Sequence, residues 1–310
     1  MFLALTVNQN KLITNLCDGH TVPDSKDVWQ TLEILGLSAQ VVTSKGGLRL
    51  AKKIKLVDAA QVRAALSAGV AFEHHLLIDS TNNALMSKPR SKNRVACTAE
   101  MQGAGRGRRG RAWSDPAGNF AASLVLFPQH PPDQIALRSF VAALALFDAL
   151  VATTGRSDTL ALKWPNDVLL NGGKVAGILL ETTALSGGGF ALTIGFGVNL
   201  VHTPQSSGFE ARAMPPVCVL SETGTALAPE EFLAALAAAY ARHEAQFCAF
   251  GFSSIRAAWL ARAARLGETI TARIGSGEIT GRFDTIDETG HLILTTAQGR
   301  QAIAAADVFF

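Results

Sequence analysis

Two stretches of the chain carry apolar residues at helical spacing, and they predict its longest helices. In the first stretch, Asp133 is placed to cap the helix. Its apolar stripe comprises Leu137, Phe140, Val141, Leu144, Phe147 and Val151. In the second stretch, Pro229 and two acidic residues open a helix that Gly251 closes. One side of this helix carries Phe232, Leu233, Leu236, Tyr240 and Phe247. Each helix therefore has one face to bury against another layer.

Short apolar runs bounded by turn residues predict strands around these helices. The runs cover residues 74–79, 95–102, 120–127, 160–165, 168–170, 174–183 and 190–200. Asparagine and glycine mark the turn at 171–173, and three glycines mark the turn at 187–189. Because several strands joined by hairpins accompany each helix, the pattern indicates an α+β unit in which helices face a mixed β-sheet.

The two ends of the chain show other patterns. At the start, a short helix over 11–18 and a second helix, capped by Ser25 and stopped by Gly36, precede a glycine-centred hairpin over 39–53. Residues 55–68 form a further helix or a connector. At the end, apolar and polar residues alternate between glycine turns, which is typical of a small β-barrel. We therefore expect three domains, at 1–67, 68–262 and 263–310.

Composition narrows the class of protein. Of the 310 residues, 48% are hydrophobic and only 17% are charged, and the formal net charge is +3. This content is inconsistent with a mainly disordered chain, and the charge is too small to draw the whole surface toward nucleic acid or membrane. The four cysteines have neither disulfide-type nor zinc-type spacing, which is typical of reduced thiols.

No segment resembles a targeting signal or a membrane anchor. The N-terminus lacks the basic and apolar regions of a secretory signal. The most apolar stretch, residues 135–153, is interrupted by Arg138 and Asp148, so it falls short of the roughly 18 uninterrupted apolar residues of a membrane span. We therefore expect a soluble cytoplasmic protein with no membrane partner.

The densest chemical signal is the loop of residues 105–111, GRGRRGR, which lies between a predicted strand and Trp113. It matches the dinucleotide fingerprint G-x-G-x-x-G, but no helical pattern follows and residues 123–132 contain no acidic residue for the ribose. The partner motifs of a kinase loop are absent from the sequence, and so is a Walker A motif. A nucleotide loop of these kinds is therefore not favoured.

Glycine amides and guanidinium groups together favour an anion at this loop. Four arginines in seven residues repel one another, and an anionic ligand would offset that repulsion. The alternatives are a solvated charge run and an RGG-type RNA contact. Such RNA-binding segments are usually repeated, whereas this loop is single and lies between buried strands. We therefore expect it to bind an anion.

Three further clusters lie at the ends of predicted strands. Residues 163–167 read KWPND and are followed by Lys174 and Gly177, although this segment also fits a plain hairpin with a solvated lysine. Residues 79–82 read DSTN, where the hydroxyl residues also fit a helix cap. Residues 195–199 read GFGVN, and their small side chains would let a planar ligand lie against the backbone.

Taken in order, these motifs resemble those of biotin protein ligases. The resemblance rests on DSTN, QxAGRGRRGRxW, KWPND, KxAGILxE and GxGxN, and it covers residues 70–310. Lipoate ligases share the fold but carry a different glycine-rich motif. The resemblance implies a catalytic domain like that of class II aminoacyl-tRNA synthetases and biotin ligases, an SH3-like C-terminal barrel and a reduced winged-helix-like N-terminal unit.

The resemblance also implies a two-step reaction. Biotin and MgATP give biotinyl-5′-AMP and pyrophosphate, and the biotinyl group then passes to a lysine of the biotin carboxyl carrier protein of acetyl-CoA carboxylase. A cationic loop suits this reaction, because both reacting groups are anionic. Two unit charges of the same sign about 4 Å apart repel by about 4 kcal/mol at an effective dielectric constant near 20. Without compensation, this repulsion between carboxylate and α-phosphate would slow the first step roughly a thousandfold.

Roles for single residues follow from the same resemblance. The catalytic cations are Lys174, Arg106 and Arg108. Biotin is held by Ser80, Thr81, Asn82, Gln102, Gly105, Arg106, Gly107, Arg108, Lys174 and Gly177. ATP is held by Arg108, Arg111, Trp113, Asn166, Asp167, Lys174 and Asn199. Mg²⁺ is oriented, with ATP, by Asn166 and Asp167. We also expect the arginine loop to be disordered without ligand, and residues 202–216 to fold over the adenylate.

The N-terminal unit departs from the pattern of larger bacterial relatives, which carry a DNA-binding winged helix there. Residues 20–24 leave no room for the helix that braces the motif, and the recognition-type helix carries Asp24, Asp27 and Glu33 against one Lys26. Since phosphate contacts supply much of DNA affinity, we do not expect DNA as a partner. A biotin-responsive DNA-binding repressor is the alternative function. An edge of the central sheet is available to a homodimer or to the carrier domain.

Overall fold

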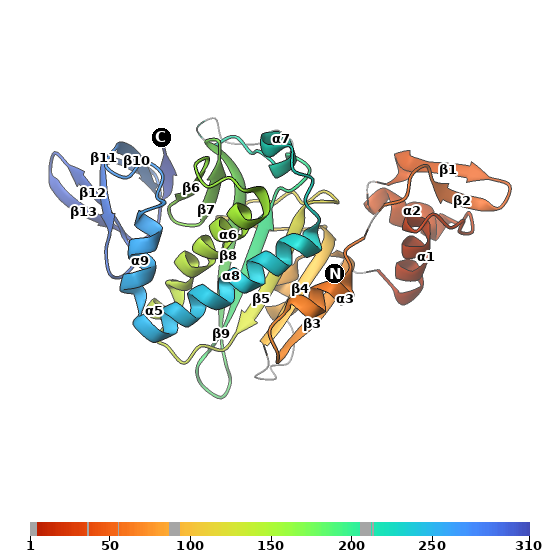
Figure 1. Cartoon of the computed structure of the whole chain (residues 1–310), viewed down its shortest axis with the longest axis horizontal. Helices are drawn as coiled ribbons and strands as arrows, with labels where there is room; N and C mark the ends of the chain where they lie inside the picture. The colour runs from red at the N-terminus through yellow and green to blue at the C-terminus, as the bar shows by residue number, and fades with distance from the viewer. Residues whose placement is uncertain (1–4, 36, 55, 87–93, 205–211, 213) are drawn as a thin grey trace.

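The computed structural model describes residues 5–35, 37–54, 56–86, 94–204, 212 and 214–310. Their strands form three sheets: a pair β1-β2, a seven-stranded sheet in the order β3-β4-β5-β9-β8-β7-β6, and a five-stranded sheet in the order β13-β12-β11-β10-β14. The seven-stranded sheet lies in the middle of the molecule, with the N-terminal unit at one end and the C-terminal sheet at the other (Figure 1).

The central sheet is mixed, as predicted. Its strands are β3 (Val70–Ile78), β4 (Arg94–Gln102), β5 (Phe120–Leu126), β6 (Leu160–Lys163), β7 (Asp167–Leu170), β8 (Gly173–Ala184) and β9 (Phe190–Val198). Strands β3 and β4 run parallel, and all other neighbours in the sheet run antiparallel. All seven predicted strands are present, and the α+β class is confirmed.

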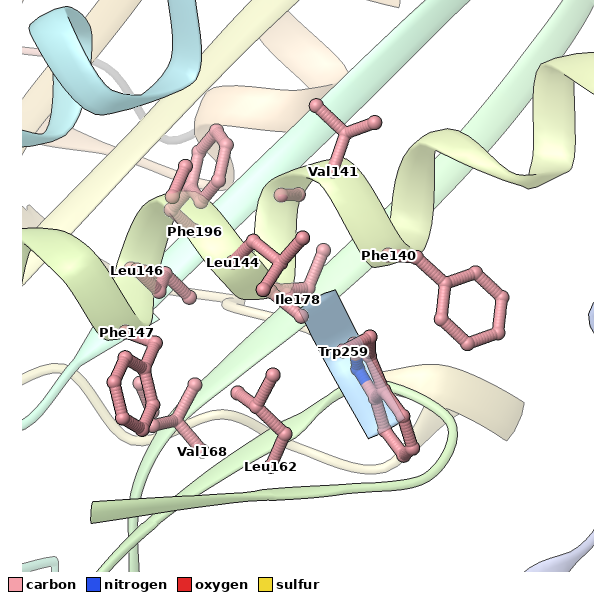
Figure 2. Close-up of a cluster of buried hydrophobic side chains, with 14 of the residues drawn as sticks. Phe140, Val141, Leu144, Leu146, Phe147, Leu162, Val168, Ile178, Phe196 and Trp259 are labelled. Atoms are coloured by element: carbon pink, nitrogen blue, oxygen red, sulfur yellow. The ribbon is translucent and has the colours of Figure 1, made fainter. Parts of the chain in front are cut away.

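Two long helices, α6 (Arg138–Thr154) and α8 (Pro229–Phe250), pack on each other and cover one face of this sheet. The apolar stripe of α6 meets the sheet directly. Leu144 of α6, Ile178 of β8 and Trp259 of α9 (Phe252–Leu260) belong to one buried cluster, which Figure 2 shows. Burial of these apolar side chains is the main term that holds helices and sheet together.

The start of the first long helix differs from the prediction. Asp133 does not cap it, because a separate short helix, α5 (Pro132–Ala136), begins after Pro131 and places Asp133 in its first turn. Proline has the backbone φ that a helix start requires, and a carboxylate there interacts favourably with the helix dipole. Asp133 therefore stabilises the start of α5 through its charge and not through a side-chain cap.

Residues 132–154 are also more apolar than the interruptions at Arg138 and Asp148 suggested. By length and composition this stretch could cross a membrane, with a mean hydropathy of 2.0, but 72% of its apolar 18-residue window is buried inside the protein. A core helix of a soluble protein passes the same test, so the stretch is weak evidence for a span. Arg138 itself is buried and pairs with Glu244 of α8, with 2.8 Å between the charged atoms.

The opposite face of the sheet carries the short helix α4 (Thr81–Met86), which packs on β4, β5 and β9. Ala84 and Leu85 of α4 join a small apolar cluster with Cys97 and Val125 of the strands. The strand ends that carry DSTN, KWPND and GFGVN meet on this face or at its rim.

The C-terminal unit is a five-stranded antiparallel sheet, which confirms the predicted β unit. Its strands are β10 (Thr269–Ile274), β11 (Gly277–Ile286), β12 (Leu292–Thr296), β13 (Gly299–Ile303) and β14 (Asp307–Phe309). Its buried residues belong to the same core as α6 and α8. The indole nitrogen of Trp164 donates to the Gly290 carbonyl at 3.1 Å, and Leu162 of β6 bridges to Ala263. The outer edge of β6 is therefore partly occupied.

The N-terminal unit comprises α1 (Val7–Cys17), α2 (Lys26–Ile34), a 3₁₀ turn η1 (Ser38–Gln40), β1 (Val41–Ser44), β2 (Gly47–Leu50) and the connecting α3 (Ala59–Ala65). Ser25 accepts from the Val28 amide and so caps α2, as predicted, while the expected stop at Gly36 lies outside the described residues. Between α1 and α2, the described residues form no helix, only the bridge from Val22 to Leu48. The bracing helix is therefore missing, as the sequence indicated.

Candidate active site

Three glycines form a floor on the α4 face of the sheet. A Cβ atom at Gly197 would lie closer than 3.0 Å to the Trp113 ring, and one at Gly195 would lie closer than 3.0 Å to the Asn82 amide. A Cβ atom at Gly177 would touch both the Trp113 ring and the Lys174 side chain. The sequence predicted a planar ligand on this backbone, but the ring of Trp113 lies there instead.

The arginine loop is a small hairpin. The Trp113 amide donates to the Gly105 carbonyl at 2.8 Å, and the Gly107 amide donates to the Arg111 carbonyl at 2.7 Å. At its tip, the 3₁₀ turn η2 (Arg108–Gly110) places Arg109 at φ 57 and Gly110 at φ 71. Residues 114–119 are not helical, so the loop does not open a helix as a Rossmann loop does.

Arginines of this loop bond to polar groups of the sheet. Arg106 lies 3.2 Å from the Glu181 carboxylate and donates to the Asn83 side-chain oxygen at 2.5 Å. Arg108 donates to Asn166 Oδ1 at 3.3 Å. Burial lowers the pKa of Arg108, and the nearby carboxylates oppose this shift. Arg106 therefore lies beside α4 and β8, and Arg108 lies beside the KWPND turn.

The other two arginines reach the C-terminal sheet. Arg109 and Arg111 both donate to Asp307 of β14, Arg109 at 2.7 Å, and Arg273 of β10 lies 3.1 Å from the same carboxylate. Burial would raise the pKa of Asp307, but hydrogen bonds from Arg111 and Arg273 hold it below its usual range. Arg111, which was expected to hold ATP, is thus bonded to the barrel and does not point at the floor.

A lysine–aspartate group lies beside the floor. Lys174 Nζ is 2.7 Å from Asp167 Oδ1 and 5.6 Å from the centre of the Trp113 ring. Lys163 Nζ lies 3.9 Å from the other oxygen of Asp167. Burial lowers the pKa of Lys163, and the charge of Asp167 opposes this effect. Two cations therefore share one carboxylate, which leaves positive charge for an incoming anion.

The expected metal role of Asn166 and Asp167 finds no support in this geometry. The Asn166 amide donates to the Ile178 carbonyl at 2.6 Å while its oxygen accepts from Arg108, and Asp167 faces two lysines. Mg²⁺ takes oxygen ligands, keeps several waters and is commonly bound through substrate phosphates. These two residues do not fit a metal ion held by them alone.

A buried polar chain runs through the DSTN segment. Ser80, Thr81 and Asn82 are each only 3% exposed. The Thr81 amide donates to Gln102 Oε1 at 2.9 Å, and the Ser123 hydroxyl lies 2.7 Å from Thr81 Oγ1. The same hydroxyl lies 2.5 Å from Asn82 Oδ1. Thr81 and Asn82 are more than a helix cap, because they bond to the neighbouring strands. The Ser80 hydroxyl accepts from the Asn83 amide at 3.5 Å, as a helix cap does.

Two carboxylates complete this chain, and the sequence reasoning assigned a role to neither. Asn82 donates to Glu181 at 2.8 Å, and Glu181 in turn pairs with Arg106. At the other end, Gln102 donates to Asp115 at 3.3 Å. Glu181 closes the KxAGILxE motif, so its place in that motif was the available signal. Asp115 lies two residues after Trp113, and nothing in the sequence pattern marked it.

Asn199 lies just after β9 with its amide oxygen buried. Its side-chain nitrogen donates to the Val217 carbonyl at 3.0 Å, and no described residue donates to Oδ1. Residues 214–217 run beside the start of β8, where the Val217 amide donates to the Lys174 carbonyl at 3.0 Å. Of the segment expected to fold over the adenylate, residues 205–211 and 213 lie outside the described residues. Its described end leads into α7 (Val219–Thr223).

The structure thus brings the predicted residues together in two neighbouring groups. One group surrounds the glycine floor and contains Arg108, Trp113, Asn166, Asp167, Lys174, Gly177 and Asn199. The other is the buried chain that contains Ser80, Thr81, Asn82 and Gln102. Arg106 adjoins the second group through Glu181 and Asn83, and Gly105 and Gly107 carry the backbone bonds of the arginine hairpin.

The fold and the site together define a class of ligase. Residues 76–199 match the Biotin/lipoate A/B protein ligase family, and residues 266–310 match the Biotin protein ligase C terminal domain. A biotin–[acetyl-CoA-carboxylase] ligase of Paracoccus denitrificans is 56% identical over 233 residues, which are 75% of this chain and 97% of that protein. The chain belongs to the biotin protein ligase family.

Two more distant relatives extend the comparison. The bifunctional ligase/repressor BirA of Bacillus subtilis is 28% identical, over 91% of this chain and 88% of its own length. The structure of biotin protein ligase from Aquifex aeolicus in complex with biotin and ATP superposes with a TM-score of 0.65 at 27% identity. That superposition covers 78% of this chain and 98% of the Aquifex chain.

Proposed function

We propose that this chain is an ATP-dependent biotin protein ligase. It forms biotinyl-5′-AMP from biotin and MgATP, and it transfers the biotinyl group to a lysine of the biotin carboxyl carrier protein of acetyl-CoA carboxylase. The observation that carries the proposal is the position of Lys174, which lies between Asp167 and the Trp113 ring at the rim of a glycine floor. Several cations meet there, where two anionic reactants must approach each other.

In the first step, a carboxylate oxygen of biotin attacks the α-phosphorus of ATP, and the bond to the pyrophosphate oxygen breaks. Lys174 and Arg108 offset the repulsion between the reactants and the charge that develops on the leaving group. Arg106 closes the hairpin over the pair while it stays bonded to Glu181. The hairpin also holds the reactants in line, which contributes through proximity.

Each substrate has its own set of partners. The buried chain of Ser80, Thr81, Asn82 and Gln102 supplies the donors and acceptors that a ureido ring requires. The adenine lies between Trp113 and Asn199, whose buried Oδ1 can accept from the exocyclic amine. Asn166 and Asp167 are bonded to other groups of the chain, so Mg²⁺ would be held through the ATP phosphates and would offset their charge.

In the second step, the neutral amine of the acceptor lysine attacks the acyl carbon, and AMP leaves. We expect the carrier domain to approach the α4 face, because the glycine floor and the arginine hairpin lie there. The proposed domains are 1–67, 68–262 and 263–310, with catalysis in the second. Three of the four free cysteines are buried, which suits the cytoplasmic location that we propose.

A repressor function is not part of the proposal. The N-terminal unit lacks the bracing helix among its described residues, and α2 carries more acidic than basic charge. Residues 262–264 occupy part of the β6 edge of the central sheet, so a homodimer through a sheet edge would use the part of the β3 edge that the N-terminal unit leaves uncovered.

The test is biotin-dependent exchange of pyrophosphate into ATP. Removing the Lys174 ammonium by Lys174→Ala should lower the exchange rate by about 100-fold or more, as loss of a transition-state donor does. Lys52→Ala, at an exposed site of the N-terminal unit, is the matched control and should exchange at the wild-type rate. Wild-type protein without exchange, or undiminished exchange by Lys174→Ala, would refute the site assignment.

A further inference from the structure

We infer that Asp115 is a positioning residue for biotin: it orients the side-chain amide of Gln102. The ionised carboxylate of Asp115 orients this amide better than the neutral acid does. The inference rests on the proposed function, because it assigns Gln102 to the biotin pocket. It adds a residue that no motif of the chain contains. It also adds a dependence of biotin affinity on pH.

The Asp115 carboxyl group is buried against the end of β4. The residue is 6% exposed, although it lies in the irregular segment between the arginine hairpin and β5. Its Oδ2 accepts from Gln102 Nε2 at 3.3 Å, and no described residue donates to Oδ1. A buried carboxylate is costly unless it is hydrogen-bonded. Its position so close to Gln102 therefore calls for a functional explanation.

Gln102 is held at both ends of its amide. Its Oε1 accepts from the Thr81 amide at 2.9 Å and from the Thr81 hydroxyl at 3.2 Å, and its Nε2 donates to Asp115. The last torsion of a glutamine is broad and roughly two-fold, so the oxygen and nitrogen exchange places unless partners on both sides distinguish them. When it is ionised, Asp115 can accept hydrogen bonds but cannot donate them, so it favours the orientation with the Gln102 nitrogen toward itself. That choice decides which atom of Gln102 biotin meets.

Asp115 changes charge near neutral pH. Burial raises its pKa to about 7, against the opposing hydrogen bond from Gln102, and the charge of Glu100 on β4 adds to the increase. Glu100 itself accepts from the Val57 amide at 2.5 Å and lies 3.3 Å from His74 Nε2. Above pH 7 the carboxylate is a charge-assisted acceptor. Below pH 7 the neutral acid is a weaker acceptor that can also donate, so the orientation of Gln102 is less well defined.

The experiment measures the dissociation constant of biotin alone by calorimetry, at pH 6 and pH 8, with the full chain and without ATP. For the wild type we expect binding about fivefold weaker at pH 6 than at pH 8, from the difference between a charged and a neutral acceptor. Asp115→Asn keeps an acceptor oxygen but cannot ionise, so its affinity should not change between the two pH values. Asp115→Ala removes the acceptor and should bind about tenfold more weakly at both.

Controls separate this inference from the proposed function. Asp133→Asn, at an exposed position of α5, should keep the wild-type pH dependence. If Asp115→Ala does not fold, the Asn variant alone decides, because only its pH profile is required. A pH-dependent Asp115→Asn, or a tightly binding Asp115→Ala, would overturn the inference. If Gln102→Ala binds biotin as the wild type does, the proposed biotin pocket itself is wrong.

Discussion

At the scale of single residues, the site depends on side chains that are small enough to leave room. Gly197→Ala would place a Cβ atom closer than 3.0 Å to the Trp113 ring, which must then move away from the floor. Such overpacking typically costs about 1–3 kcal/mol. Because Trp113 bounds the proposed adenine site, we expect the KM for ATP to rise about tenfold or more, measured by pyrophosphate exchange at varied ATP.

The matched control for this change is Gly187→Ala, in the turn between β8 and β9, where a new Cβ atom would meet nothing within 4 Å. This variant should have the wild-type KM for ATP. The affinity of Gly197→Ala for biotin should stay close to that of the wild type, because the buried chain around Gln102 does not contact Gly197. An unchanged KM for ATP would show that the position of Trp113 does not matter for the nucleotide.

The sequence motifs identified the residues that we expect to touch a ligand. They did not identify the side chains that hold those residues in place. Lys174 and Gln102 stand in recognisable motifs. Asp307 and Asp115 stand in none, and Asp307 reaches Arg111 across 196 residues of sequence. A counter-charge can come from any strand that folds nearby, so no local spacing reveals it. The repulsion among the loop arginines is therefore partly offset within the protein itself, because Glu181 and Asp307 supply opposite charges.

At the scale of elements, β14 and the arginine hairpin are joined by one carboxylate. Asp307→Asn would remove the charge that Arg109 and Arg111 share. Exposed ion pairs contribute about 0.2–1 kcal/mol each, so the whole protein should lose little stability. The hairpin should open more often, and we expect trypsin to cleave after its arginines several times faster than in the wild type.

The pH dependence of hairpin opening, followed by amide hydrogen exchange, gives this prediction a second readout. Since the pKa of Asp307 is held low by its arginine partners, its stabilising effect is fully present above the ordinary carboxyl pKa and is lost as the pH falls from there to the lowered pKa. Glu278→Gln removes a comparable exposed pair of the barrel, with Arg212 at 2.7 Å, and should leave cleavage of the hairpin unchanged. Wild-type cleavage of Asp307→Asn would mean that the barrel does not hold the loop.

Most elements could be predicted because their apolar residues repeat with the period of the structure that they form. The strands of the central sheet and the helix α8 have this property. Other elements lack this repeat. Helix α9, which was not predicted, has nine residues and follows Gly251 at once, so it offers too few turns to show a stripe. Its buried Trp259 is explained only by the packing against α6 in Figure 2.

At the scale of the whole molecule, the N-terminal unit is joined to the catalytic sheet by apolar packing. Leu76 and Leu77 of β3 belong to the same buried cluster as the helices of this unit, and Met101 of β4 packs against it. The unit therefore covers the β3 side of the sheet. The match to the Paracoccus relative leaves out a quarter of this chain while it spans nearly all of that protein. The support for a structural role of the N-terminal unit is its apolar packing on β3 and β4.

The absence of DNA binding is the prediction that tests this role. Asp24, Asp27 and Glu33 are exposed on or beside α2, and the Trp29 indole donates to Asp24 at 2.9 Å. Non-specific DNA binding typically has a Kd of about 10⁻⁴–10⁻⁶ M at physiological salt, and it tightens steeply as salt is lowered. At low salt, with biotin and ATP present, we expect no mobility shift of duplex DNA at micromolar protein.

A variant with Asp27→Lys and Glu33→Lys should gain salt-dependent binding, because each new phosphate contact releases a counterion. An adenylate-dependent shift of one specific duplex by the wild type would instead establish the repressor alternative.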